Sequence, residues 1–254
     1  MKVAVLAKEV PDLEASVKVA EGGAALDIEK RKVLNFFDEI AVEAALKLKE
    51  SIGAEVYAVS AGAGTGTEAL RRAIAMGIPT AFLINDPALD GANPLTVARA
   101  LAAFVQTQGF DLIIAGRQAT DDEAGLVGPM VAEILGIPSV VGITVLEAEE
   151  GKVRVTRETE SGKETIELPL PALVTAEKGL YEARVPAVTG VMKAMRAKIE
   201  SKSLADLGVE VAEPVKVLGY RPPAKRAAVK MIPGDAATAA AELVKLLREE
   251  AKVL

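Results

Sequence analysis

The sequence predicts an α/β fold: a doubly wound, mostly parallel sheet with a β-rich extension and a C-terminal arm. In the first two thirds of the chain, short apolar runs alternate with longer amphipathic stretches, which is typical of right-handed strand–helix–strand units. After Pro138 the runs become short and are separated by turns, and from about Gly179 the periodicity is lost. We therefore expect one α/β domain over residues 1–198, which includes the extension, and an arm over residues 199–254.

The strands and helices of the first part can be placed from their apolar patterns. Four runs are apolar enough for strands buried on both faces: Lys2–Leu6, Glu55–Ser60, Thr80–Asn85 and Asp111–Ala115. The best-marked helix follows Asn35, a predicted N-cap with Asp38 three residues later, and ends at Gly53. Its apolar stripe comprises Phe37, Ala41, Ala44, Ala45, Leu48 and Ile52. Helical spacing also predicts helices at Thr67–Met76 and Leu95–Thr107.

The rest of the chain is predicted as short strands, an arm and a final helix. The strands are expected at Ser139–Leu146, Val153–Glu158, Glu164–Leu168 and Ala172–Thr175, with a hairpin turn at Ser161-Gly162-Lys163. The arm is punctuated by Pro186, Pro214, Pro222, Pro223 and Pro233 and leads to a helix at roughly Asp235–Ala251. Such an arm buries little against its own domain, so we expect it to reach over a partner subunit, with disorder as the alternative.

Composition excludes several classes of function. The 254 residues contain no Cys, His or Trp, which removes disulfides, thiolate or imidazole metal sites and His-dependent catalysis. A net charge of −6 and 3% aromatic residues argue against a nucleic-acid binder. No run approaches the ~20 apolar residues that cross a bilayer, and the first strand is too short for a signal peptide. We expect a bacterial cytoplasm or an organelle matrix, and no membrane insertion.

A glycine-rich segment, Gly62–Thr67, follows a predicted strand and opens a helix. This is the setting of a phosphate-binding loop, and Asp86 follows about 20 residues later, as in dinucleotide-binding folds. However, Thr67 replaces the third glycine of that fingerprint, and the preceding strand is not the first of the fold. A glycine-rich turn is therefore favoured over an NAD site, and no P-loop motif occurs in the sequence.

The loop after the fourth strand is the more specific candidate site. It runs from Gly116 to Pro129 and enters a helix whose stripe includes Met130, Val131, Ile134 and Leu135. In doubly wound sheets, ligands bind at this end of the strands, and the N–H groups at a helix start suit phosphate. The three adjacent acids Asp121, Asp122 and Glu123 leave open a hard cation or a charged helix cap.

A second candidate segment combines small apolar residues with cations. Residues 184–198 place Val188 between Arg184 on one side and Lys193 and Arg196 on the other, with Met192 nearby. This pattern is typical of a docking loop with an apolar tip inside a basic rim, or of a helix start with a solvated basic face. Residues 214–230 carry five cations and no acid, which favours an acidic protein surface or a solvated linker.

At these residues the sequence resembles the β subunits of electron transfer flavoproteins over nearly its whole length. The resemblance is carried by Val3–Pro11 with Ala7-Lys8, Leu34–Glu43, Ala58–Gly62, Gly116–Asp122, Val155–Thr175 and Met192-Lys193-Ala194. It implies a Rossmann-like fold of the adenine-nucleotide-binding type and a heterodimer with an α subunit that holds most of the FAD. It also implies a structural AMP in this chain.

By position, the resemblance places the AMP site on a defined set of residues. These are Leu6, Asn35, Phe36, Phe37, Asp38, Ala61, Gly116, Arg117, Gln118, Ala119, Thr120, Asp121, Asp122, Glu123, Ala124, Gly125, Leu126 and Val127. Phe37 matches a position near the flavin ring, whereas the family's aromatic residue near the first strand is Leu13 here. The residues implied to dock a partner dehydrogenase are Arg184, Val188, Met192, Lys193 and Arg196, with Val188 where relatives carry Leu.

The function implied by the resemblance is electron transfer without a catalytic residue in this chain. The heterodimer would carry electrons from flavin dehydrogenases, notably acyl-CoA dehydrogenases of fatty acid oxidation, to a membrane quinone oxidoreductase. In flavin-bifurcating relatives a second FAD replaces AMP and the complex oxidises NADH; those relatives tend to carry Gly-Asp-Thr where this chain has Asp122-Glu123-Ala124. A more distant alternative is a free-standing nucleotide-binding enzyme. The source compartment would be a bacterial cytoplasm, or the mitochondrial matrix in a eukaryote.

Overall fold

A computed structural model describes residues 1–211, 215–226 and 228–254. The chain forms two compact units. The first comprises Met1–Lys18 and Leu26–Leu218, and the second comprises Val19–Ala25 and Gly219–Leu254. Pro214, which the sequence analysis placed in the arm, lies outside the described residues. Within those residues, no helix is long and apolar enough to cross a membrane.

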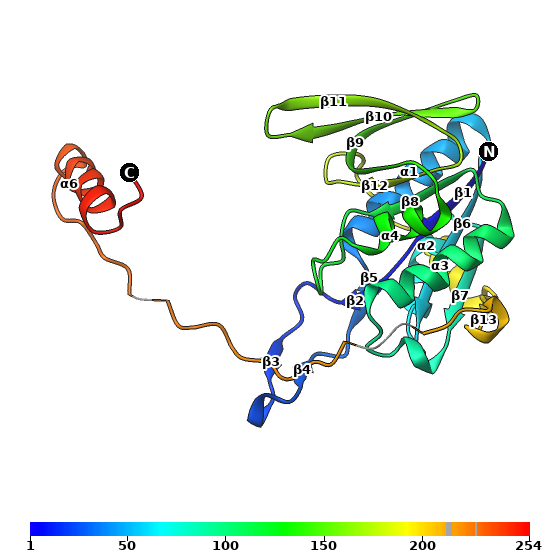
Figure 1. Cartoon of the computed structure of the whole chain (residues 1–254), viewed down its shortest axis with the longest axis horizontal. Coiled ribbons are helices and arrows are strands. Elements are labelled where there is room, and N and C mark those ends of the chain that lie inside the picture. Colours follow the sequence, from blue (N-terminus) through cyan, green and yellow to red (C-terminus); the bar gives the residue numbers. More distant parts are fainter. Residues whose placement is uncertain (212–214, 227) are drawn as a thin grey trace. The chain divides into compact units, whose positions relative to one another are not determined.

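The first unit is built on one large sheet, and its mostly parallel, doubly wound order confirms the predicted fold class (Figure 1). Within the described residues the strand order is β11-β10-β9-β12-β8-β1-β6-β7-β13. The parallel ladders join β1 (Lys2–Leu6), β6 (Glu55–Gly62), β7 (Thr80–Asn85), β8 (Leu112–Gly116), β12 (Ala172–Ala176) and β13 (Glu200–Lys202), with β9 (Ser139–Glu149) parallel to β12. The antiparallel ladders join β9 to β10 (Lys152–Thr159) and β10 to β11 (Gly162–Pro169). The β-rich extension therefore continues the main sheet.

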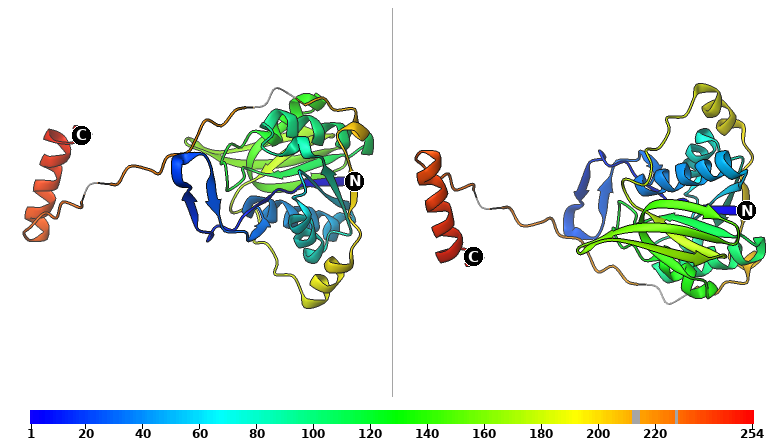
Figure 2. Two further views of the ribbon diagram at one scale, coloured as in Figure 1. Left: turned by 90° about the horizontal axis from the view of Figure 1, so that it is seen from below. Right: turned by 90° about the horizontal axis from the view of Figure 1, so that it is seen from above.

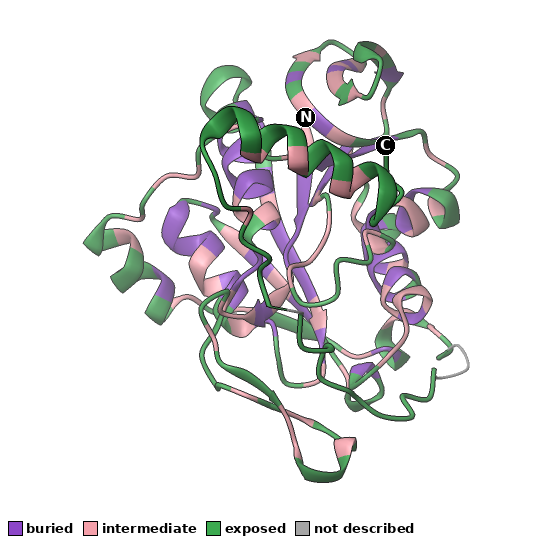
Figure 3. Ribbon diagram, turned by 90° about the vertical axis from the view of Figure 1, so that its left-hand side faces the viewer, coloured by how far each residue is buried: buried purple, intermediate pink, exposed green. Residues whose placement is uncertain are grey.

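Helices cover both faces of this sheet, as Figure 2 shows in views along its edge. The helices are α1 (Phe36–Ile52), α2 (Thr67–Met76), α3 (Pro94–Gln108), α4 (Val127–Leu135) and α5 (Val188–Arg196), with α6 (Ala236–Glu249) in the second unit. Because side chains alternate along a strand, Val3 and Val5 of β1 pack with α1 and α2, while Ala4 and Leu6 pack with α3 and α4. Figure 3 shows the buried residues concentrated in the strands and on the inner faces of the helices.

Shorter elements complete the chain, and the sequence did not predict them. The short strands are β2 (Glu9–Pro11), β3 (Val17–Val19), β4 (Leu26–Ile28) and β5 (Lys32–Leu34), and the 3-10 turns are η1 (Glu21–Gly23), η2 (Pro87–Leu89) and η3 (Ala205–Leu207). β13 pairs with β7, and the following Leu204 is buried. The first part of the predicted arm is therefore attached to its own domain. In the second unit, as far as it is described, no residue of α6 is buried.

Candidate functional site

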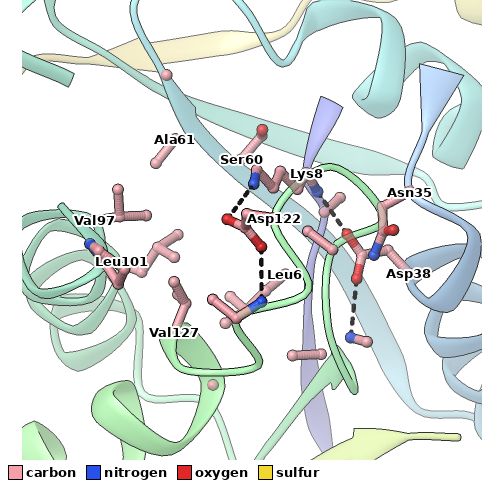
Figure 4. Close-up of a pocket in the computed structure, with 18 of the residues that line it drawn as sticks. Leu6, Lys8, Asn35, Asp38, Ser60, Ala61, Val97, Leu101, Asp122 and Val127 are labelled. Atoms are coloured by element: carbon pink, nitrogen blue, oxygen red, sulfur yellow. Dashed lines mark hydrogen bonds and ion pairs between the residues drawn. The ribbon is translucent and has the colours of Figure 1, made fainter. Parts of the chain in front are cut away.

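A cavity of about 390 Å³ lies where β1, β6 and β8 end. Leu6, Ala61 and Gly116 mark these strand ends, and α3 and α4 supply the opposite wall (Figure 4). The crevice beyond the carboxyl ends of parallel strands is the usual ligand site of doubly wound sheets, and the volume is within the range of small-molecule pockets. The arrangement therefore offers a partly open site for a small-molecule ligand at this edge of the sheet.

Two buried polar residues at the start of α1 join the segments that form this cavity. Asp38 accepts hydrogen bonds from the backbone N of Lys8 at 2.7 Å and from the backbone N of Gly116 at 2.9 Å. Asn35 donates from Nδ2 to the carbonyl of Gln118 at 2.8 Å and accepts from the N of Thr120 at 3.1 Å. Asn35 occupies the predicted N-cap position, but its side chain makes no cap hydrogen bond. Both side chains instead hold the ends of β1 and β8 and the following loop.

Burial controls the protonation of Asp38. It raises the pKa of Asp38 to about 7, although the hydrogen bonds from Lys8 and Gly116 and the charge of Lys8 act to lower it. At neutral pH the carboxyl group is therefore close to its midpoint. A protonated Asp38 has fewer lone pairs for the two backbone N–H groups, so proton uptake acts directly on the contact between β1 and β8.

We expect the carboxyl group of Asp38 to titrate near pH 7 rather than near the ordinary pKa of about 4. Because the folded state then binds this proton more tightly than the unfolded state, its contribution to stability is complete below about pH 4 and is lost as the pH rises to about 7. NMR of carboxyl-labelled protein measures the midpoint, and Asp38→Asn identifies the resonance. A midpoint near 4 would contradict the assignment.

Lys8 closes one side of the cavity. Its Nζ lies 2.7 Å from Asp121 Oδ1 and 3.0 Å from Asp122 Oδ2. Figure 4 shows the ion pair with Asp122. Burial alone would lower the pKa of Lys8, but Asp121 and Asp122 raise it above its ordinary value, so the ammonium group stays charged. This ammonium pairs with two of the three carboxylates that were candidates for a hard cation, which makes an ion pair the better account of Asp121 and Asp122.

The N-termini of two helices near the cavity differ in one respect. At α2, the Glu9 carboxylate accepts from the backbone N of Gly66 at 2.9 Å and of Glu68 at 3.0 Å, so an anion of the chain itself occupies the glycine-rich loop. At α4, the N-cap residue Leu126 makes no side-chain hydrogen bond, and the first helical residues, Val127 and Gly128, line the cavity. Since the first N–H groups of a helix need acceptors, the start of α4 is the better site for a ligand anion.

The remaining wall is apolar. Val97 and Leu101 project from α3 toward the side of the cavity opposite Asn35 and Asp38, as Figure 4 shows. On the neighbouring strand β6, Ser60 lines the same cavity, and its hydroxyl is buried and has no hydrogen-bond partner among the described residues. An apolar slot that adjoins an anion-binding helix start suits a planar base with an attached phosphate.

Comparison with known proteins agrees with this geometry. Residues 25–207 match the family model described as "Electron transfer flavoprotein domain". The chain is 39% identical to the electron transfer flavoprotein subunit beta of Bacillus subtilis, with 100% of each chain covered, and 38% identical to that of Bradyrhizobium diazoefficiens, also with 100% of each. The subunit from Sus scrofa is 36% identical, with 100% of this chain and 99% of the relative covered. The chain belongs to the electron transfer flavoprotein β-subunit family.

The structure brings most of the site residues implied by the family together. Those lining the cavity are Leu6, Asn35, Asp38, Ala61, Gly116, Arg117, Gln118, Ala119, Asp121, Asp122, Ala124, Gly125, Leu126 and Val127. Four others, Phe36, Phe37, Thr120 and Glu123, are not among the lining residues. Phe36 and Phe37 stack edge to face at 5.2 Å between ring centroids. Val97 and Leu101 also line the cavity but were not predicted as site residues, although their four-residue spacing on a predicted helix was a detectable signal.

The second candidate segment, residues 184–198, contributes no residue to the lining of the cavity. Val188 is the first residue of α5 and is 76% exposed, and Met192 and Met195 are also exposed. The last carbonyls of α5, those of Ala194 and Met195, accept hydrogen bonds from Arg71 of α2 at 2.6 and 3.0 Å. Apolar side chains are thus held toward solvent by a fixed backbone, which is typical of a binding surface.

Proposed function

We propose that this chain is the β subunit of a heterodimeric electron transfer flavoprotein, with AMP in the cavity and FAD held mainly by an α subunit. The heterodimer accepts electrons from flavin dehydrogenases, such as acyl-CoA dehydrogenases, and delivers them to a membrane quinone oxidoreductase. The chain acts as an electron carrier subunit and not as an enzyme. Family membership supports the assignment, and the cavity between β1, β6 and β8 supports a nucleotide ligand.

The observation that carries the AMP assignment is the start of α4, which has no side-chain cap and lines the cavity. Its N–H groups would hold the phosphate, because helix N-termini attract anions. Val97 and Leu101 would contact the adenine, and Asn35 would fix the loop over it through Gln118. The groups present therefore fit a mononucleotide.

The other cofactor supplies the redox chemistry. When bound, the isoalloxazine ring of FAD accepts and releases the electrons, and the protein determines its position and surroundings. In this chain, Phe37 is the residue we propose to lie near the ring. The protein partner would bind to the exposed segment 184–196, whose apolar side chains supply contact and whose Lys193 and Arg196 would attract an acidic rim.

The cofactor content of the heterodimer tests this proposal. After co-expression with the α subunit and purification, denaturation is expected to release one FAD and one AMP per heterodimer, measured by chromatography against protein concentration. Two FAD and no AMP would replace the proposal with the flavin-bifurcating alternative. A chain that forms no complex with the α subunit, yet retains a nucleotide, would favour a free-standing nucleotide-binding enzyme.

A further inference from the structure

Glu43 is a carboxylate buried in the middle of α1, outside the cavity described above. The residue is 2% exposed. Arg184 donates to it from Nε at 2.7 Å and from a terminal guanidinium nitrogen at 2.8 Å, and the backbone N of Arg184 donates to it at 3.2 Å. Burial alone would raise the pKa of Glu43, but the hydrogen bonds and charge of Arg184 hold the pKa below its ordinary value. The two residues thus form a bidentate ion pair in which Glu43 is shielded from water.

Arg184 lies in the middle of a segment that has no regular structure of its own. Residues 181–187 connect the sheet to α5 without a helix or strand. Since such a segment has no internal hydrogen-bond ladder, its course depends on contacts with the rest of the domain. The pair with Glu43 therefore fixes the residues that immediately precede Val188.

The other end of the segment is held separately. Gly190 packs so closely on α2 that a Cβ there would lie 2.4 Å from the carbonyl oxygen of Ala75. Arg71 binds the last carbonyls of α5, as described above. With α5 held on α2 and its approach held on α1, Val188 and Met192 are presented to solvent from a backbone fixed on both sides.

We propose that Glu43 is a positioning residue for partner docking: through Arg184 it fixes residues 181–187 and so presents the tip of the segment in a single orientation. This inference rests on the proposed function, in which residues 184–196 bind a partner dehydrogenase. A binding surface that is ordered before the encounter loses less conformational entropy on association, so removal of the anchor weakens binding and leaves electron transfer within the complex intact.

The test compares two glutamates of α1 in the complete heterodimer. In the assay, an acyl-CoA dehydrogenase is reduced by its acyl-CoA and the flavoprotein is its electron-accepting substrate. Glu43→Gln is expected to raise the KM for the flavoprotein by about tenfold and to change kcat by less than twofold. Amide hydrogen exchange over residues 185–196 is expected to accelerate by about tenfold. The matched control is Glu39→Gln, which removes a carboxylate of the same helix that pairs at 2.7 Å with Arg72 rather than with Arg184. It is expected to leave both quantities within twofold.

A second variant keeps the test decisive if Glu43→Gln fails to fold. Arg184→Lys retains the positive charge beside Glu43 but cannot form the two-pronged contact, and it is expected to raise KM in the same direction by about threefold. In the double variant, the increase in KM is expected to be smaller than the product of the two single increases, because both changes act on the contact between Glu43 and Arg184, while Arg184→Lys also alters the hydrogen bond of Arg184 to Glu50 at 2.7 Å.

Each outcome bears on a separate statement. Unchanged hydrogen exchange over residues 185–196 in Glu43→Gln would overturn the statement that Glu43 fixes this segment through Arg184. If Glu43→Gln accelerates exchange but leaves KM unchanged, while Val188→Asp raises KM, the inference would be overturned and the docking role would remain intact. If neither Glu43→Gln nor Val188→Asp changes KM, the docking role in the proposed function is overturned, and the inference is overturned with it.

Discussion

Val188→Asp is expected to slow the reduction of the flavoprotein by its partner dehydrogenase at least tenfold. Val188 is 76% exposed in the segment that we propose to bind the dehydrogenase. Burying a valine side chain at an interface contributes about 1.5–3 kcal/mol, which corresponds to one to two orders of magnitude in affinity. A carboxylate at the same place loses this contribution and brings an unpaired charge into an apolar pocket, which costs a similar amount or more.

The variant should remain folded, which makes the result interpretable. Val188 is the first residue of α5, and an acidic side chain in the first turn of a helix is favourable. FAD content, AMP content and chemical reduction by dithionite are therefore expected to match the parent, while Val188→Leu is expected to be neutral or slightly faster. Flavin bleaching driven by the dehydrogenase measures the rate. Equal rates for the Asp variant and the parent would show that this segment does not dock the dehydrogenase.

Gly116→Ala is expected to destabilise the chain by roughly 2–6 kcal/mol and to lower AMP content well below one per heterodimer. A Cβ at Gly116 would lie 2.3 Å from Asp38 Oδ1 and 2.7 Å from Phe37 Cβ. Overpacking alone costs roughly 1–3 kcal/mol, and displacing Asp38 from the N–H of Gly116 leaves a buried polar group unsatisfied for a further ~1–3 kcal/mol. The start of α1 would have to move away from the cavity.

Thermal unfolding of the heterodimer and AMP release measure the two effects of Gly116→Ala. The control is Gly109→Ala, at the end of α3, where φ is +63° but no atom lies within 4 Å of the added carbon. Its cost is limited to backbone strain of about 1–2 kcal/mol, with AMP content unchanged. If Gly116→Ala proved no more harmful than Gly109→Ala, the close approach of α1 to β8 would not be what shapes the site.

The strands and helices of the main sheet were predictable because their signals are local. Short apolar runs located β1 and β7, and helical periodicity located α2, with the bounds that the structure has. β13 was missed because Glu200–Lys202 is short and polar, and only its pairing with β7 makes it a strand. Ile52 was assigned to the apolar stripe of α1 but is 51% exposed at the last residue of the helix.

The candidate site was predicted in outline but not in its chemistry. The loop after β8 and the start of α1 could be chosen from sequence, because chain order in an α/β fold places them at the same edge of the sheet. Their hydrogen bonds could not, because Asn35 and Asp38 bind residues about 80 positions away in the chain, where local rules predict only a helix cap. In the same way, nothing local to the glycine-rich loop indicates that Glu9 fills it.

Asp38 and Glu43 are side chains of one uninterrupted helix, and this restricts how the chain can change in length. A single residue inserted between them would turn Glu43 by about 100° around the axis of α1 and away from Arg184, while Asp38 kept its place between Lys8 and Gly116. A deletion would do the same in the opposite sense. The spacing between these two residues is therefore expected to be invariant among functional homologues, whereas the exposed turn between β10 and β11 can tolerate insertions.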